Sequence, residues 1–170
     1  GGGALFFAIQ PQQAIISDTN PELINLYRVV SSQVEQLILE LDKYYNDQDF
    51  FYEIRALKFE NLDNVQAAAR TIFLNKTCFN GLYRVNRKGL FNVPIGSYKT
   101  PPICNKDNLI AISKLLQGVT INCADYKECI QFINEKTFVY IDPPYRPLTG
   151  TSSFTAYSEN GFDDKEQIEL

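Results

Sequence analysis

One short stretch constrains the fold of this chain more than any other: residues 138–145, Phe-Val-Tyr-Ile-Asp-Pro-Pro-Tyr. Its first four residues alternate aromatic and aliphatic side chains, which predicts a short buried strand of a parallel sheet. The two prolines lack the amide hydrogen that a sheet ladder needs, so the strand must end there in a rigid turn. In open α/β sheets, ligands bind just past the carboxyl ends of the strands. The stretch therefore predicts an α/β fold with a binding site at this turn.

The turn carries groups that suit a planar amine. Ionised Asp142 accepts hydrogen bonds and cannot donate them, and the carbonyl of Pro143 is a second acceptor on a backbone that proline holds fixed. Two convergent acceptors suit an amino group that donates two protons, and Tyr145 can stack on the ring that bears it. The alternative is a strand end with a capping aspartate and a Pro-Pro turn, which many α/β proteins contain.

The same residues carry a resemblance to a known family. The run Asp142, Pro143, Pro144 and Tyr145 resembles the catalytic motif of amino-group methyltransferases. Its continuation to residue 157, together with residues 79–86 and 89–94, resembles the Dam-type adenine-N6 DNA methyltransferases. The similarity covers almost the whole chain. It implies a Rossmann-like, S-adenosylmethionine-dependent methyltransferase sheet with an inserted helical and β-hairpin target-recognition domain.

Both ends of the chain suggest that the sheet is incomplete. The sequence starts at three glycines with no strand before them, contains no methionine, and stops within residues 166–170, where a helix is beginning. We expect residues 1–20 and 107–170 to form a partial catalytic domain, and residues 21–106 to form the recognition insertion. No signal peptide is evident, and no apolar run approaches the roughly 18 residues that span a membrane. We expect a monomer in the bacterial cytoplasm.

Hydrophobic periodicity outlines the elements between these motifs. Residues 14–18 and 119–123 are predicted strands. Apolar residues at steps of three and four predict a helix over 22–45, with Asn20 as its N-cap and Pro21 in its first turn. Further helices are predicted over residues 50–59, 65–77 and 127–134. Another helix is predicted to start at a cap formed by Asn105 or Asp107 and to end at Gly118. A hairpin is predicted over residues 82–94.

A glycine-rich turn and acids at strand ends are the candidate cofactor groups. Such a turn lets backbone amides approach a ligand, although three N-terminal glycines are equally typical of a cloning remnant. An acid after the second strand of a nucleotide-binding half commonly holds ribose hydroxyls. The resemblance implies that the glycines meet the methionine part of S-adenosylmethionine and that the last acid and its aromatic neighbour bind the cofactor adenine. Helix capping is the alternative for each acid. The predicted cofactor-binding residues are Gly1, Gly2, Gly3, Ala4, Asp18, Asp125, Tyr126 and Asp142.

The net charge of −4 would normally argue against nucleic acid, but the charge is unevenly distributed. Residues 64–106 contain seven Lys and Arg residues and no Asp or Glu. Because aromatic residues are interleaved with these charges, the segment is typical of a surface that binds a polyanion. The alternative is a solvated basic loop.

The resemblance assigns this segment to DNA recognition. It implies that Phe79 wedges into the duplex, that Asn80 helps to control a flipped adenine, and that other residues of the segment read base edges. Ser97 stands where a family member has a basic residue, so outer-base contacts are not carried over. The predicted DNA-binding residues are Phe79, Asn80, Leu82, Arg84, Arg87, Lys88, Pro94 and Lys99. The polar loop over residues 152–161 is expected to become ordered around DNA or the flipped base.

The predicted function is methyl transfer from S-adenosylmethionine to adenine N6 in double-stranded DNA, and the resemblance suggests GATC as the site. No metal is expected, since the chain has no His and its four Cys lack zinc-type spacing. A restriction endonuclease that acts on the same site is a candidate partner. Two alternatives stay open: an amino methyltransferase that acts on cytosine N4, RNA or a protein amide, and a DNA-binding fragment without activity.

Overall fold

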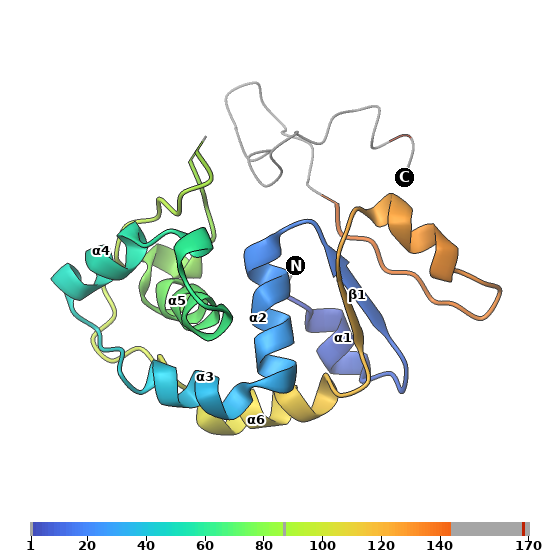
Figure 1. Ribbon diagram of the computed structural model, residues 1–170, viewed down its shortest axis with the longest axis horizontal. Helices are drawn as coiled ribbons and strands as arrows, with labels where there is room; N and C mark the ends of the chain where they lie inside the picture. The colour runs from blue at the N-terminus through green and yellow to red at the C-terminus, as the bar shows by residue number, and fades with distance from the viewer. Residues whose placement is uncertain (1, 87, 144–167, 169–170) are drawn as a thin grey trace.

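Two short parallel strands form the sheet (Figure 1). The computed structural model describes residues 2–86, 88–143 and 168 of the chain. In it, β1 (Ile15–Asp18) and β2 (Thr120–Cys123) pair with Ile16 opposite Ile121. Both strands were predicted from the sequence to within a residue, and the mixed α/β class with a small parallel sheet is confirmed. Parallel strands cannot be joined by a tight turn, and here the chain between them forms a long helical excursion.

The other elements of the described chain are helical. In chain order they are α1 (Ala4–Ile9), α2 (Pro21–Ser32), α3 (Val34–Leu41), α4 (Gln48–Ala56), the 3-10 helix η1 (Phe59–Asn61), α5 (Asn64–Thr77), the 3-10 helix η2 (Phe79–Gly81), α6 (Lys106–Leu115) and the 3-10 helix η3 (Tyr126–Phe132). In Figure 1, α2 stands between the sheet on one side and α5 on the other.

Polar side chains fix where these helices start. Asn20 Oδ1 accepts from the amides of Glu22 and Leu23, at 2.9 and 3.2 Å, which confirms the predicted cap of α2. Asp63 and Gln66 form a reciprocal capping box at the start of α5. Of the two candidate caps of α6, Asn105 is the one observed. The predicted helices over residues 50–59 and 65–77 are confirmed as α4 and α5, with ends shifted by up to three residues.

The single helix predicted over residues 22–45 was wrong, because the structure divides it into α2 and α3. Gln33 between them has φ −138° and ψ 34°, outside the helical region. Ser32 Oγ donates to the carbonyl of Arg28 at 2.7 Å, and Ser31 Oγ donates to the carbonyl of Leu116 at 3.3 Å. Adjacent serines that bond to main-chain carbonyls are a common cause of helix bends. Periodicity did not reveal the break, since apolar residues continue at helical spacing across it.

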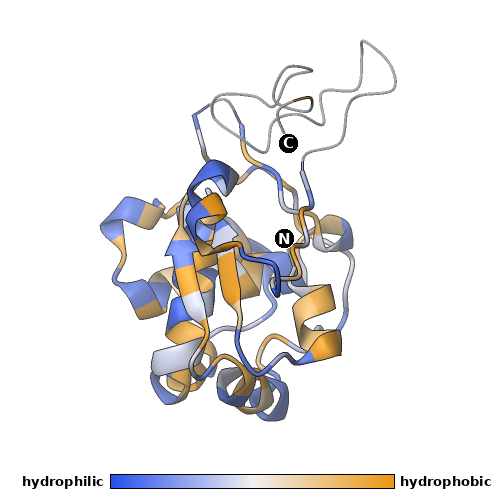
Figure 2. Cartoon of the chain, turned by 90° about the vertical axis from the view of Figure 1, so that its right-hand side faces the viewer, coloured by the Kyte–Doolittle hydropathy of each residue, from blue (hydrophilic) through white to orange (hydrophobic). Residues whose placement is uncertain are grey.

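The core consists of two clusters. The first joins α2, α3, α5 and α6, and the sheet and α1 pack against it; its buried members are Tyr27, Val29, Val30, Leu37, Leu41, Ala68, Ala69, Leu109 and Leu116. The second is an aromatic cluster that joins α4 and α5 to the chain after α5; its buried members are Phe51, Ile54, Phe73, Leu74, Cys78, Phe91 and Val93. Hydrophobic and hydrophilic residues alternate along the helices (Figure 2), which agrees with the apolar stripes predicted from the sequence.

The predicted hairpin over residues 82–94 is present only in reduced form. Its turn is formed: Gly89 has φ +72°, and the amide of Asn86 donates to the carbonyl of Leu90 at 2.8 Å. Val85 and Phe91 form a single antiparallel bridge, and the described residues on either side form no strand. The amide of Asn92 donates to the carbonyl of Arg84 at 3.0 Å, and a side-chain bond accompanies it, from Arg84 Nε to Asn92 Oδ1 at 2.8 Å.

The buried strand predicted for residues 138–141 was wrong. These residues form no strand and their side chains are exposed, with Phe138 77% and Tyr140 62% accessible. A strand of this composition is stable only when neighbouring strands pair with its backbone. In the described part of the chain the ladder contains only β1 and β2, so this segment has no strand beside it. The helix predicted over 127–134 is the 3-10 helix η3, one residue earlier at its start.

Tyr44 gives the aromatic region a pH dependence. Its ring lies edge-on to Phe50 and Phe73, with centroids 5.6 and 5.3 Å away. Burial, with a smaller contribution from the charge of Glu40, raises the pKa of Tyr44 to about 12 from its usual value of 10.0. As the pH rises, the Tyr44 hydroxyl loses its proton in the unfolded chain before it does so in the folded protein. The contribution of Tyr44 to the free energy of unfolding is therefore fully present below pH 10 and is lost as the pH rises toward 12.

We predict that Tyr44→Phe makes the protein more resistant to alkali. Relative to the wild type, the variant should gain on the order of 1 kcal/mol between pH 8 and pH 11, a modest value because the ring is only partly buried. Urea unfolding at both pH values measures the change. Tyr45→Phe, which alters an exposed ring beside it, is the control. Equal pH dependence in the wild type and Tyr44→Phe would contradict the prediction.

Candidate cofactor and DNA-binding site

The parallel pairing of β1 and β2 brings two of the predicted acids to one edge. Asp18 ends β1 opposite Cys123, the last residue of β2. The amide of Ala124 donates to the carbonyl of Asp18 at 3.1 Å, so the pairing continues one residue past the strand. Asp125 follows immediately. Because the carboxyl ends of parallel strands share one edge of the sheet, both acids lie at the edge where α/β proteins bind ligands.

Both acids take part in local turns. Asp18 Oδ1 accepts from the amide of Asn20 at 2.8 Å, but Asn20 rather than Asp18 caps α2. Asp125 Oδ1 accepts from the amide of Lys127 at 3.0 Å and forms a capping box with Glu128 at the start of η3. Capping, the alternative considered for Asp125, is therefore present. A carboxylate has about four acceptor sites, so one capping bond is compatible with a ligand on the same group.

The glycine-rich turn lies against Tyr27 and Phe7. Gly3 has φ +67° and stands at the N-terminus of α1. A Cβ atom on Gly3 would lie 2.7 Å from Tyr27 Oη and 2.9 Å from Phe7 Cε2, closer than real contacts allow. Burial raises the pKa of Tyr27, and the negative charge of Asp18 raises it further. The turn, Tyr27 and Asp18 are thus neighbours. Of the predicted glycines, Gly1 lies outside the described residues.

Tyr126 presents a buried polar atom at the same edge. Its hydroxyl oxygen is inaccessible to solvent and has no hydrogen-bond partner within the part of the chain that the structure describes. The ammonium of Lys127 lies 5.7 Å from the ring centroid. Among the described residues this hydroxyl therefore has unused hydrogen-bonding capacity, and leaving such a group unpaired costs roughly 1–3 kcal/mol.

The predicted catalytic motif is only partly described. Asp142 and Pro143 are placed, with Asp142 exposed, whereas Pro144, Tyr145 and the loop over residues 152–161 lie outside the described residues. That the four motif residues lie together with the other candidates thus stays a prediction.

A tight left-handed turn presents Phe79 to solvent after α5. Asn80 and Gly81 have φ values of +54° and +60°. Asn75 Nδ2 donates to the carbonyl of Gly81 at 2.7 Å, and the amide of Phe79 donates to the carbonyl of Pro94 at 2.9 Å. The turn is thereby tied to the end of α5. The side chain of Phe79 is 50% exposed, which is unusual for a phenylalanine.

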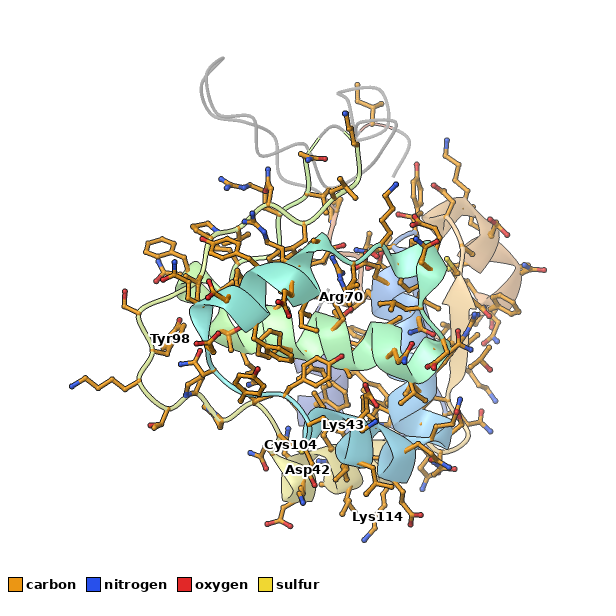
Figure 3. The ribbon with its side chains drawn as sticks, turned by 60° about the vertical axis from the view of Figure 1, so that its left-hand side comes forward. Asp42, Lys43, Arg70, Tyr98, Cys104 and Lys114 are labelled. Carbon is orange, nitrogen blue, oxygen red and sulfur yellow. The ribbon has the colours of Figure 1, made fainter. Side chains whose placement is uncertain are left out.

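The surface charge of the predicted DNA-binding segment differs from its sequence charge. Arg70 is 3% exposed and pairs with Glu22, with Nη1 3.6 Å from Oε2, so it belongs to the interior (Figure 3). Lys106 Nζ lies 2.7 Å from Asp42 Oδ2. The exposed basic residues of the described segment are Lys76, Arg84, Lys88, Lys99 and Lys106, the last of which carries this ion pair; Arg87 lies outside the described residues. Leu82 and Pro94 are exposed nearby.

Comparison with known proteins identifies the family. The model of the D12 class of N6 adenine-specific DNA methyltransferases matches residues 1–170, the entire chain. The chain belongs to this family. The family predicted from residues 79–94 and 142–145 is thereby confirmed.

Individual relatives carry matching names. They include the Type II methyltransferase M.MjaIII of Methanocaldococcus jannaschii, 44% identical over 185 residues, and the Type II methyltransferase M1.LlaDCHI of Lactococcus lactis subsp. cremoris, 40% identical over 178 residues. The DNA adenine methylase of Escherichia coli K12 is 30% identical over 174 residues. These matches cover 100% of this chain but 64%, 63% and 62% of the relatives. The chain thus spans less than two thirds of the length of these D12-class relatives.

Two kinds of feature are absent from the described residues of this family member. No group of three or more His, Cys, Asp or Glu side chains is arranged to hold a metal ion among them. None of the helices in the described ranges is both long and apolar enough to cross a membrane.

Sequence reasoning missed one neighbour of the candidate site. Tyr27 lies within the helix predicted over residues 22–45 from apolar periodicity, and its ring is in the core, but its hydroxyl lies against the glycine-rich turn. A tyrosine in place of a phenylalanine at a core position indicates that a hydroxyl reaches a partner or a surface. That signal was present in the sequence, although it does not identify the partner.

We predict that Gly3→Ala weakens the fold whereas Gly2→Ala does not. A side chain at Gly3 is strained by its positive φ and by the contact with Tyr27, which together should cost about 1–2 kcal/mol. A Cβ atom on Gly2 would have no heavy atom within 4 Å, so Gly2→Ala is the matched control. Urea unfolding at pH 7 measures both variants. Equal stability of the two would show that the turn is not held as described.

Proposed function

We propose that this chain is the part of a DNA methyltransferase that binds S-adenosylmethionine and methylates N6 of adenine in duplex DNA. The observation that carries the proposal is the match of the D12-class model to all 170 residues, together with the Asp-Pro-Pro-Tyr run at residues 142–145. As the target sequence we propose GATC, which the family resemblance suggests.

The edge formed by β1 and β2 fits the methyl donor. Asp18 offers a carboxylate to ribose hydroxyls at this edge. Gly3 lies close by, against Tyr27, and the buried Tyr126 hydroxyl has no hydrogen-bond partner among the described residues. We propose that Asp18, Gly3 and Tyr126, with Gly1, Gly2, Ala4, Asp125 and Asp142, hold S-adenosylmethionine. When bound, S-adenosylmethionine supplies an electrophilic methyl group on a sulfonium sulfur.

Asp142 and Pro143 would activate the target amine. The lone pair of the adenine amino group is delocalised into the ring, so this nitrogen is a poor nucleophile. By accepting one N–H bond each, the Asp142 carboxylate and the Pro143 carbonyl draw the nitrogen toward tetrahedral geometry and localise its lone pair. Asp142 can also accept the proton that the amine must lose. In this mechanism Tyr145 stacks on the base, which must leave the duplex to be reached, and Pro144 stiffens the turn. Positioning and electrostatics account for most of the acceleration.

We further propose that the two strands belong to a Rossmann-like sheet. Their parallel pairing and the helical crossover between them support this. In this scheme residues 1–20 and 107–170 form the catalytic part and residues 21–106 the recognition insertion. The two parts share one core, since α6 packs in the same cluster as α2, α3 and α5.

The DNA-facing residues of this scheme are those around the turn after α5. Exposed Phe79 is suited to wedge between base pairs, and Asn80 follows it in the left-handed turn. Neighbouring basic residues meet phosphates or base edges, because arginine and lysine serve both purposes. The residues we propose for this surface are Phe79, Asn80, Leu82, Arg84, Arg87, Lys88, Pro94 and Lys99.

The biological role that we propose is modification of DNA alongside a restriction endonuclease. Two relatives at 44% and 40% identity are named Type II methyltransferases, whereas those named DNA adenine methylase are 30 to 33% identical. In this role the protein acts as a monomer on DNA in the bacterial cytoplasm. A test is whether treated DNA resists endonucleases that cut at unmethylated GATC.

We predict that Asp142→Ala abolishes methyl transfer while leaving cofactor binding largely intact, because the other seven residues that we propose to hold S-adenosylmethionine are unchanged. Loss of one of two acceptors for the amine should lower the rate at least about 100-fold. The assay is transfer of tritium from labelled S-adenosylmethionine to duplexes with and without GATC, followed by nucleoside analysis. Glu135→Ala, an exposed acid in a nearby turn, is the control.

The outcomes of this assay separate the parts of the proposal. N6-methyladenine in GATC duplexes alone supports both the chemistry and the site. Label in other duplexes as well rejects the site, and N4-methylcytosine rejects the target base. An active Asp142→Ala variant would refute the assigned role of this carboxylate.

A second prediction concerns Phe79. If its ring helps to extrude the target adenine, Phe79→Ala should slow methylation of a fully paired duplex about tenfold or more. A mismatch opposite the adenine weakens pairing and makes extrusion easier, so the defect should shrink on such a duplex. Single-turnover rates on both substrates measure this. Phe132→Ala, which removes another exposed ring, should affect neither, and an equal defect of Phe79→Ala on both duplexes would exclude a wedge.

A further inference from the structure

Arg84 and Asn92 lie opposite each other near the turn at Gly89, and the side chain of Arg84 bonds to Asn92. Arg84 Nε donates to Asn92 Oδ1 at 2.8 Å, and Arg84 Nη2 donates to the carbonyl of Asn92 at 3.3 Å. The amide of Asn92 donates in return to the carbonyl of Arg84 at 3.0 Å. Asn92 thus meets both the main chain of Arg84 and one edge of its guanidinium.

The chain on either side of Asn92 is packed in the core. Its neighbours Phe91 and Val93 are 7% and 1% exposed and belong to the aromatic cluster. The carbonyl of Val93 also accepts from Arg55 Nη1 of α4 at 3.1 Å. Asn92 itself is half-buried and Arg84 is exposed. The backbone that carries the Asn92 carboxamide is therefore held by the core, whereas the guanidinium of Arg84 lies at the surface.

The bonds to Asn92 determine which donors of Arg84 stay available. A guanidinium has five N–H donors in one plane and no acceptor. Two of these donors meet Asn92, which leaves three for other partners. Guanine presents two acceptors, O6 and N7, in the major groove, and arginine is suited to meet both. The remaining donors of Arg84 therefore match the major-groove edge of guanine.

We infer that Asn92 is a positioning residue that determines specificity for guanine through Arg84. Because Asn92 Oδ1 holds Nε, the plane of the guanidinium is fixed before DNA binds, and binding costs less rotamer entropy. An arginine in another orientation can still meet phosphates, but phosphate contacts carry no sequence information. This inference rests on the proposed function, in which Arg84 faces DNA. The guanines of a GATC duplex lie in its two outer base pairs, so Arg84 discriminates at one of these pairs.

Specificity at single base pairs tests the inference. In the full-length protein, kcat/KM for methyl transfer is measured on hemimethylated GATC duplexes, in which one adenine of the site can accept the methyl group. It is measured again after one outer pair has been inverted. The ratio of the two values is the discrimination factor of that pair, expected to be at least about 5 where arginine reads guanine. Arg84→Lys keeps the charge but loses the planar fork, and should lower this factor below about 2 at one outer pair.

Two variants of Asn92 separate the acceptor from the size of the side chain. Asn92→Leu removes the acceptor of Arg84 Nε. It should lower the discrimination factor at least about threefold at the outer pair that Arg84→Lys affects, and less than about twofold at the other. Asn92→Asp retains an acceptor and should keep both factors within about twofold of the wild type. Its added negative charge weakens binding to every duplex alike, so the ratio is unaffected.

A double variant and a control complete the series. Asn92→Leu added to Arg84→Lys should lower the factor no further, because Asn92 acts through Arg84. Asn108→Ala, which shortens an exposed side chain on α6, should change neither the factors nor thermal unfolding. If Asn92→Leu does not fold, Asn92→Ala removes the same acceptor without added apolar bulk.

A bond that only ties the two sides of the turn together predicts a different result. Asn92→Leu would then lower kcat/KM on all duplexes equally and leave both discrimination factors unchanged. That result would refute the inference. So would a loss of discrimination in Asn92→Leu at the outer pair that Arg84→Lys does not affect.

The outcomes also separate this inference from the proposed function. Wild-type protein that transfers no methyl group to adenine in DNA refutes the proposed function and the inference with it. Wild-type protein that methylates GATC, while Arg84→Lys or Asn92→Leu keeps both factors, refutes the inference alone. If the wild type methylates adenine in another sequence, GATC is rejected, and the same series on the G·C pairs of that sequence decides the inference.

Discussion

The pairing of β1 with β2 is the contact on which the candidate site depends. It joins segments that are 105 residues apart in the sequence (Ile15 pairs with Thr120), and its register places Asp18 opposite Cys123. Because the strands are parallel, their carboxyl ends coincide, and the segments that leave the two strands must start at the same edge. On one side this is the first turn of α2, with Asn20 and Glu22; on the other it is the turn at Asp125 and Tyr126. A slip of one residue would reverse the side chains that face the core.

Arg70 imposes a second constraint, on the helices. A guanidinium in the interior is tolerated only when its donors meet acceptors, and here these come from two other helices: Glu22 of α2 and the carbonyls at the end of α4. Burial outweighs this partner at Glu22, whose pKa is raised by desolvation even though Arg70 lowers it. Such a cluster contributes little net stability compared with an apolar core. It does restrict how α2, α4 and α5 can pack. The cluster thus contributes to the specificity of the fold more than to its stability.

What the sequence predicted well was local. Caps at Asn20 and Asn105, the strand before Asp18 and the turn at Gly89 each depend on a few adjacent residues. The predictions that were wrong depended on distant partners. Residues 138–141 have strand composition but no strand beside them in the described chain, and the break at Gln33 is accompanied by a bond from Ser31 to Leu116. For the site, chain order indicated which acids end strands, whereas the contact of Tyr27 with the glycine-rich turn required the fold.

Charge illustrates the same limit and bears on how an acidic chain can meet DNA. By residue count the segment 64–106 is strongly basic, yet the charge of Arg70 is buried and paired with Glu22. The exposed positive charges are therefore fewer than the sequence suggests, and at least one of them is held in a defined orientation. Arg84 donates from Nε and Nη2 to Asn92, which holds the planar guanidinium in one orientation. A guanidinium is suited to bidentate contact with guanine. If Arg84 reads a base, as we propose, it does so with little rotamer entropy left to lose, and one oriented arginine can then contribute more specificity than several mobile ones.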